Sequence, residues 1–140
     1  MSYAISGRQN LFFMKSAKTI LLVDDNEDDC HIFQQIFFDK CKEGMLIILH
    51  NGVEALSVLS TLDEVPALLV TDLNMPMIDG TELREAIRLN SKYNSMNIVI
   101  LSTSPSCGQD SEMSDTYAKP CSMELYKEVV KGILDRFIIE

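Results

Sequence analysis

The sequence lacks any long apolar run, and none of its apolar segments approaches the roughly eighteen residues that a membrane span requires. Residues 1–18 contain an arginine and a Phe-Phe pair but neither the apolar core nor the cleavage site of a signal peptide. We therefore expect no membrane partner and a cytoplasmic location.

Cysteine pairing signals are also missing. The four cysteines lie far apart and form no C-x-x-C pair: Cys30, Cys41, Cys107 and Cys121. This spacing predicts neither a zinc site nor a disulfide framework, and it fits the reduced thiols of a cytosolic protein.

Positive charge is scarce, because 12 Lys and Arg residues face 21 Asp and Glu residues, for a formal net charge of −9. Such a surface repels phosphates, so we expect no nucleic-acid partner. It suits basic protein surfaces and divalent cations, although solubility alone is the simpler explanation of the charge.

The chain does contain a regular alternation of short apolar runs and helix-period segments. Its 140 residues, 46% of them hydrophobic, are enough for one folded domain with a core. Strands are expected at 19–23, 45–49, 67–71, 97–101 and 116–118, and helices at 27–40, 53–62, 81–89 and 123–137. Read in series, these units predict an α/β fold with a doubly wound, five-stranded parallel sheet and helices on both faces.

The helical spacing of Val53, Leu56, Leu59 and Leu62 marks the second helix. In the last helix, Leu125, Val129, Ile133 and Phe137 are expected to form the buried stripe. Residues 105–114 are rich in Pro, Ser, Gly and acids, so the helix expected after the fourth strand is short or absent.

Polar residues stand where the predicted strands end: Asp24 and Asp25, Asp72, Ser102, and Lys119. The carboxyl ends of parallel strands share one edge, where α/β sheets bind ligands. Taken singly, each residue has a plain explanation as a helix cap, a turn residue or a solvated lysine. Together they predict three carboxylates, a hydroxyl and an ammonium in one place.

Three close carboxylates repel one another unless a cation intervenes. Mg²⁺ prefers a few carboxylates together with waters and phosphate oxygens, so we expect Mg²⁺ as the cofactor. An aspartate beside such an ion can attack phosphorus to give an acyl phosphate, with a lysine as a second positive contact.

The ordered motifs resemble the receiver domain of bacterial two-component response regulators, close to the single-domain chemotaxis type with its flavodoxin-like fold. They are Leu22-Val23-Asp24-Asp25, Asp72-Leu73-Asn74-Met75-Pro76-Met77-Ile78-Asp79-Gly80, Leu101-Ser102-Thr103 and Lys119-Pro120. The resemblance implies a receiver domain at 18–140. Residues 1–17 are then an N-terminal extension, disordered or not native to the protein.

The resemblance also implies roles for single residues. Asp72 is the phosphoacceptor, and Asp25, Asp72 and the backbone carbonyl of Asn74 bind the metal directly. Asp24 acts on the metal through water. Ser102 is the switch hydroxyl and Lys119 contacts a phosphoryl oxygen. The Lys119–Pro120 bond is expected to be cis.

Two features depart from the family pattern. Thr116 occupies the position where the family has an aromatic residue, and Tyr117, one place later, is expected to point to the other face of its strand. A one-residue bulge would restore the aromatic residue to the site. The segment after the fourth strand is also shorter than the family pattern requires.

The leading functional hypothesis is a stand-alone receiver that takes a phosphoryl group from a histidine kinase, a phosphotransfer protein or a small phosphodonor. It signals by contact with an unknown output protein, and it catalyses its own phosphorylation and dephosphorylation. The alternative is a phosphorylation-independent, pseudo-receiver interaction module. An aspartyl-phosphate hydrolase ranks last, because Asn74 stands where a second acid is needed. His31 and His50 are expected to lie away from the strand ends.

Overall fold

The computed structural model describes residues 2–6, 18–103 and 115–138. The strands are β1 (Ser2–Ser6), β2 (Thr19–Val23), β3 (Gly44–Leu49), β4 (Leu68–Asp72), β5 (Asn97–Ser102) and β6 (Thr116–Ala118). The helices are α1 (Glu27–Lys40), α2 (Gly52–Leu59), α3 (Gly80–Arg88), the 3-10 helix η2 (Ser91–Tyr93) and α4 (Met123–Phe137).

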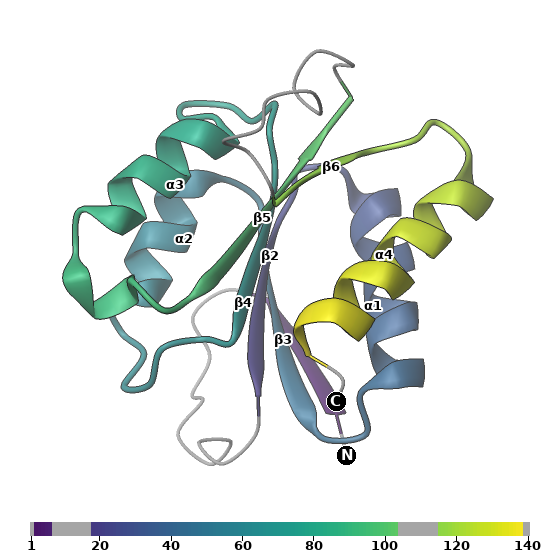
Figure 1. Cartoon of the computed structure of the whole chain (residues 1–140), viewed down its shortest axis with the longest axis horizontal. Coiled ribbons are helices and arrows are strands. Elements are labelled where there is room, and N and C mark those ends of the chain that lie inside the picture. The colour runs from purple at the N-terminus through teal and green to yellow at the C-terminus, as the bar shows by residue number, and fades with distance from the viewer. Residues whose placement is uncertain (1, 7–17, 104–114, 139–140) are drawn as a thin grey trace.

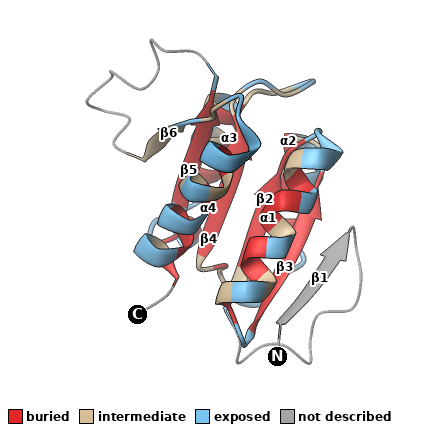
Figure 2. Ribbon diagram, turned by 90° about the vertical axis from the view of Figure 1, so that its right-hand side faces the viewer, coloured by how far each residue is buried: buried red, intermediate tan, exposed pale blue. Residues whose placement is uncertain are grey.

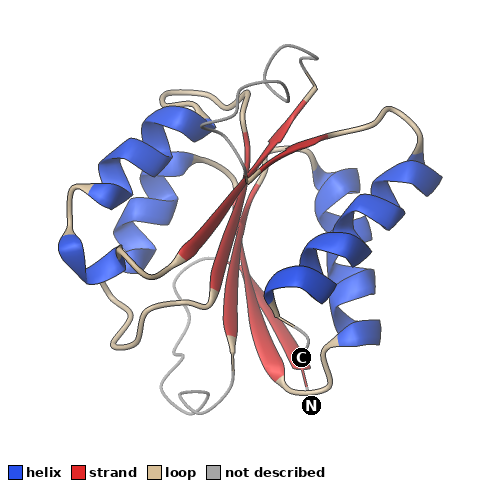
Figure 3. Cartoon of the chain, viewed as in Figure 1, coloured by secondary structure: helices blue, strands red, loops and turns tan. Residues whose placement is uncertain are grey.

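The strands form one parallel sheet in the order β1-β3-β2-β4-β5-β6. Helices α1 and α4 cover one face and α2 and α3 cover the other, as Figures 1 and 3 show. The predicted doubly wound α/β fold is therefore confirmed. No helix in the described ranges is long and apolar enough to cross a membrane.

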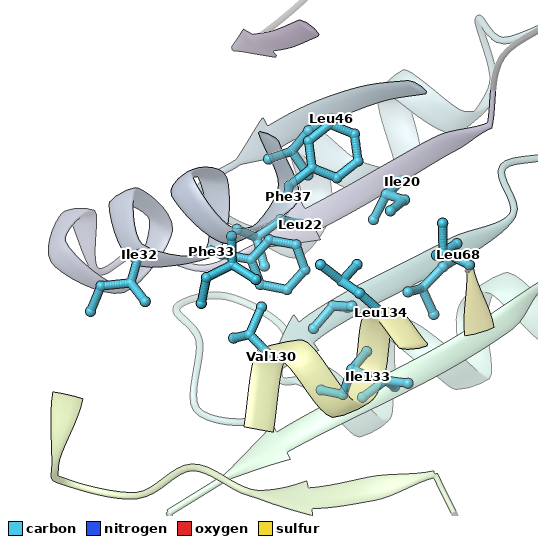
Figure 4. Packing of buried hydrophobic residues seen from close by; sticks show 14 of the residues in the cluster. Ile20, Leu22, Ile32, Phe33, Phe37, Leu46, Leu68, Val130, Ile133 and Leu134 are labelled. Atoms are coloured by element: carbon cyan, nitrogen blue, oxygen red, sulfur yellow. The ribbon is translucent and has the colours of Figure 1, made fainter. Parts of the chain in front are cut away.

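The strands have apolar side chains on both sides because each face of the sheet carries a core. Ile20 and Leu22 pack with α1 and α4, whereas Leu21 and Val23 pack with α2 and α3. Figure 4 shows the first of these clusters, in which Phe33 of α1 lies beside side chains of α4. In Figure 2 the strands β2 to β5 are almost wholly buried and the outer helix faces are exposed. The buried sheet thus fixes the positions of the residues at its strand ends.

One edge of the sheet differs from the five-stranded prediction. Strand β1 pairs in parallel with β3, from Ser2 beside Gly44 to Ser6 beside Ile48, and adds a sixth strand. Its five residues carry too little apolar pattern to stand out in the sequence, and the pairing satisfies backbone groups of β3 that an edge strand leaves open. The domain boundary at residue 18 stays a prediction.

The predicted bounds of β2, α1, β6 and α4 agree with the structure, and those of the other strands and helices shift by a few residues. The short or absent helix predicted at 105–114 lies outside the described residues. The predicted buried stripe of α4 is partly wrong, because Leu125 is 58% exposed. Steps of four residues drift around a helix of 3.6 residues per turn. The buried residues of α4 are Tyr126, Val130, Ile133 and Leu134.

Two leucines of α4 test this assignment of its buried face. Leu134→Ala is expected to lower the free energy of unfolding by about 2–5 kcal/mol, since Leu134 is fully buried and its loss leaves a cavity. Leu125→Ala is the matched control and is expected to change it by less than about 0.5 kcal/mol. Urea unfolding measures both, and equal losses would contradict the assignment.

Candidate functional site

The chemistry-bearing residues lie where parallel strands end, on one edge of the sheet. Asp24 and Asp25 follow β2, Asp72 ends β4, Ser102 ends β5 and Lys119 follows β6. The connections that leave β2, β4 and β6 emerge from the same edge (Figure 1). The fold therefore brings together residues that are up to 95 positions apart in the chain.

Three aspartates form the centre of the site, and we call them the acidic cluster: Asp24, Asp25 and Asp72. One oxygen atom from each lies within 4.8 Å of the others. Asp24 is fully buried, Asp72 is 9% exposed and Asp25 is exposed. The backbone helps to fix the cluster, since the side chain of Asp24 accepts a hydrogen bond from the N–H of Asn26 at 2.9 Å.

Lys119 lies among these carboxylates. Its Nζ is 2.9 Å from Asp24 Oδ2, 3.3 Å from Asp72 Oδ2 and 2.8 Å from Asp29 Oδ2. Its backbone N–H donates to the carbonyl of Ser102 at 2.8 Å, which ties β6 to the end of β5. Desolvation lowers the pKa of Lys119, but hydrogen bonds to Asp29 and Asp24 outweigh it and raise the pKa above its ordinary value. The ammonium is therefore charged at every physiological pH.

The carboxyl of Asp72 titrates abnormally. Desolvation raises its pKa to about 6, with the charges of Asp24 and Asp25 adding to the rise and that of Lys119 opposing it. Burial likewise raises the pKa of Asp24, although Lys119 and the backbone of Asn26 act against it. Crowded carboxylates out of water hold their protons more tightly, so the cluster favours any cation that can replace a proton.

The loop between β4 and α3 packs closely against the backbone of Asp72. Gly80 N–H donates to the carbonyl of Leu73 at 2.8 Å, and Asp79 caps α3 in a reciprocal pair with Glu82. A Cβ at Gly80 would lie 2.7 Å from the carbonyl oxygen of Asp72, so only glycine allows this close approach. Met77 has φ 71°, a left-handed conformation that side chains rarely adopt. The loop is thus tightly specified.

The strand carrying the departures from the family pattern is regular. Thr116 pairs with Ile100, Tyr117 with Leu101, and no bulge interrupts this described ladder. Tyr117 packs against the α1 and α4 cluster, and its hydroxyl accepts a hydrogen bond from Arg136 at 2.7 Å. The expectation that Tyr117 points away from the site is confirmed, and the bulge that would restore it is absent.

Two other predictions are wrong. His50 directly follows β3, and its Nδ1–H donates to the backbone carbonyl of Asp24 at 3.2 Å, so it lies at the strand ends rather than away from them. The described residues contain no cis peptide bond, so Lys119–Pro120 is trans, the isomer that an X–Pro bond favours by about 0.5–1 kcal/mol. His31 lies on α1, where its Nε2 is 3.2 Å from Nε2 of Gln35.

Asp29, in the first turn of α1, was not among the predicted site residues. The available signal was its spacing of four residues after Asp25, one helical turn into an element that begins at the site. Asn74 was predicted, and its side-chain amide lies 3.5 Å from Thr103 Oγ1. The metal-binding role of its backbone carbonyl stays a prediction.

The donor set suits a hard divalent cation. Asp72 Oδ1 is buried and has no hydrogen-bond partner among the described residues, although a buried carboxylate oxygen ordinarily has one. Carboxylate oxygens are the ligands that such ions prefer, and three of them meet here. The residues present therefore fit a divalent metal ion.

The fold and the site define a class: a doubly wound α/β domain with an aspartate cluster and a lysine at the carboxyl edge of its sheet. The sequence pattern of the response regulator receiver domain matches residues 20–131. The chain belongs to this family.

Named relatives agree with this assignment. The response regulator Rcp1 of Synechocystis sp. is 34% identical over 92 residues, which is 62% of this chain and 63% of Rcp1. The sensor histidine kinase CheAY of Helicobacter pylori is 28% identical over 120 residues, 80% of this chain but 14% of CheAY. The match thus spans less than two thirds of either protein. A chemotaxis protein CheY homolog of Campylobacter jejuni is 28% identical over 120 residues, 82% of this chain and 91% of the homolog.

Solved structures share the fold. The Mn²⁺-bound form of Rcp1 has a TM-score of 0.74 at 27% identity, with 84% of this chain and 92% of that one covered. The phosphorylated cyanobacterial phytochrome response regulator RcpA has a TM-score of 0.76 at 24% identity, with 87% and 94% covered. The second likeness concerns the fold alone.

A pair of glycine substitutions tests the close approach behind Asp72. Gly80→Ala is expected to lower the free energy of unfolding by about 1–3 kcal/mol, because the added methyl group meets the Asp72 backbone. Gly132 is an exposed residue of α4, and a Cβ added there would meet no atom of another element within 4 Å. Gly132→Ala is therefore expected to raise the free energy of unfolding by about 0.5–1 kcal/mol. Thermal unfolding distinguishes them, and a Gly80→Ala protein as stable as the wild type would contradict the geometry.

The pKa of Asp72 predicts a pH-dependent effect on stability without divalent cations. Because this pKa is about 6 in the folded protein and near 3.8 in the unfolded chain, ionised Asp72 opposes folding above about pH 6, and the penalty vanishes below about pH 4. Asp72→Asn is therefore expected to raise the free energy of unfolding by about 1–2 kcal/mol near pH 8, net of its lost contact with Lys119, and by almost nothing near pH 4.

Urea unfolding in a chelator at the two pH values measures this gain. Asp28→Asn, at an exposed position of α1, is the control and is expected to change little at either pH. A lower free energy of unfolding for Asp72→Asn than for the wild type near pH 8 would contradict the predicted destabilisation by ionised Asp72.

Proposed function

We propose that this receiver domain is a phosphorylation-controlled switch in which Asp72 accepts a phosphoryl group in an Mg²⁺-dependent reaction. The observation that supports it is the environment of one carboxylate. Asp72 has a buried, unpartnered oxygen, two further aspartates within 4.8 Å and an ammonium 3.3 Å away. A nucleophile needs a free lone pair, and phosphoryl transfer needs positive charge around the oxygens that carry charge in the transition state.

Asp25, Asp72 and the backbone carbonyl of Asn74 would hold the metal ion directly, and Asp24 would act through a water molecule. The ion supplies charge neutralisation at the phosphoryl oxygens. The solved relative Rcp1 has an Mn²⁺-bound form, and Mg²⁺ is the hard cation that prefers few carboxylates and several waters.

The chain's own residues carry the transfer. A lone pair of the Asp72 carboxylate forms the new O–P bond while the bond from phosphorus to the donor's leaving group breaks, and that group departs with the electron pair. Lys119 contacts a phosphoryl oxygen from the opposite side of the cluster. Ser102, buried at the end of β5, turns its hydroxyl toward the phosphoryl group and couples its presence to the surface.

The partners follow from this chemistry. The donor is a histidine kinase, a phosphotransfer protein or a small phosphodonor, and the output is contact with another protein in the cytoplasm. A net charge of −9 opposes direct nucleic-acid binding. The domain promotes its own phosphorylation and hydrolysis, and its role is signalling rather than metabolism.

A second candidate is a phosphorylation-independent interaction module of the same fold. The observation that favours it is β6, where Thr116 replaces the family's aromatic residue and Tyr117 faces the α1 and α4 cluster. The aromatic residue that the family places at position 116 is then missing from the switch. The two candidates differ in whether Asp72 reacts at all.

Incubation with acetyl phosphate and Mg²⁺, followed by intact-mass spectrometry, separates them. The wild type is expected to gain one phosphoryl group and Asp72→Asn none. Asp25→Ala is expected to fold but to react at least about tenfold more slowly, because it loses a metal ligand. Asp28→Asn is the matched control and reacts like the wild type. No uptake by the wild type would replace the switch with the interaction module.

A further inference from the structure

Among the described residues, Asp29 is the one ion-pair partner of Lys119 that lies outside the acidic cluster. It lies in the first turn of α1, where its backbone N–H is held by the Asn26 cap at 3.0 Å. Its Oδ2 lies 2.8 Å from Lys119 Nζ, while the contact of Lys119 with Asp72 measures 3.3 Å. The ammonium thus has a partner outside the metal-binding set.

Lys119 and a divalent cation would share the same carboxylates. Both are positive, and Lys119 Nζ contacts Asp24 Oδ2 and Asp72 Oδ2, which belong to the carboxylates that would face the metal ion. The ammonium cannot readily leave, because its side chain is only 8% exposed and lies 5.9 Å from the ring centroid of Tyr126. The ammonium and the metal ion repel each other when both contact the same carboxylates. Metal binding is therefore favoured when the lysine has a further anionic partner.

We propose that Asp29 is a positioning residue that holds the Lys119 ammonium when the acidic cluster binds a divalent cation. Asp29 keeps the lysine near the cluster without occupying a metal-binding oxygen. It therefore raises the affinity for the cation and keeps the lysine within reach of a phosphoryl group. This inference rests on the metal site of the proposed function.

A simpler effect of charge makes a different prediction. Any carboxylate near the site attracts cations, and removing one weakens binding slightly whether or not Lys119 is present. Asp28, the neighbour of Asp29 in the same helical turn, is exposed and forms no ion pair within the described part of the chain. The substitution Asp28→Asn removes the same charge as Asp29→Asn but leaves the ion pairs of Lys119 intact, so it is the matched control.

The test is Mg²⁺ binding by isothermal titration calorimetry on the full chain with no phosphodonor present. Asp29→Asn is expected to weaken Mg²⁺ binding about five- to tenfold, at the low end of the coupling between interacting sites, and Asp28→Asn less than about twofold. Asp29→Glu is expected to restore most of the affinity. Circular dichroism without Mg²⁺ checks that each variant is folded.

Lys119→Gln completes the cycle. In that background the effect of Asp29→Asn is expected to shrink to that of Asp28→Asn, because no ammonium remains to be held. An Asp29→Asn effect equal to that of Asp28→Asn, or one that persists undiminished in Lys119→Gln, would overturn the positioning role while leaving the metal site in place. A wild type that binds no Mg²⁺ would overturn both this inference and the metal-dependent function.

Discussion

The repulsion among carboxylates gathered at the ends of parallel strands is the constraint on which the rest of this site depends. The doubly wound sheet leaves no choice about where Asp24 and Asp72 point, because β2 and β4 are neighbours and both end at the same edge. Burial removes the water that would screen their charges, and the pKa of Asp72 rises to about 6 as a result. Without a cation, Lys119 balances only part of this negative charge. A bound metal ion would reduce the remaining repulsion among the carboxylates.

The apolar layers explain why the site keeps its geometry despite that repulsion. Each central strand is buried on both faces, between α1 and α4 on one side and α2 and α3 on the other. The loop behind Asp72 is closed by Gly80 and by the reciprocal cap of Asp79 with Glu82. Stability supplied by the core thus holds an electrostatically unfavourable arrangement in place, as functional sites often require.

The fold and most of the site could be predicted from the sequence because both depend on local patterns. An apolar run that ends in Asp24 or Asp72 fixes a strand and the residue at its tip, and parallel pairing then brings the tips together. The edge strand β1 could not be predicted, since its pairing with β3 is a long-range backbone contact with little apolar signal. Asp29 was missed although its spacing from Asp25 offered a signal, because its contact with Lys119 also depends on where β6 ends. His50 was placed wrongly because its contact depends on how the end of β3 approaches Asp24, which no spacing in the sequence specifies.

The most direct test of this account is the pKa of Asp72, measured in the metal-free protein by carbon-13 NMR of the aspartate side-chain carboxyls, with Asp72→Asn used to assign the signal. The account predicts a value near 6, well above the ordinary 3.8, because the carboxyl is desolvated and crowded by like charges. A value at or below the ordinary one would show that the strand ends do not crowd their negative charge. The physical basis for cation binding and phosphoryl acceptance at this edge would then be lost.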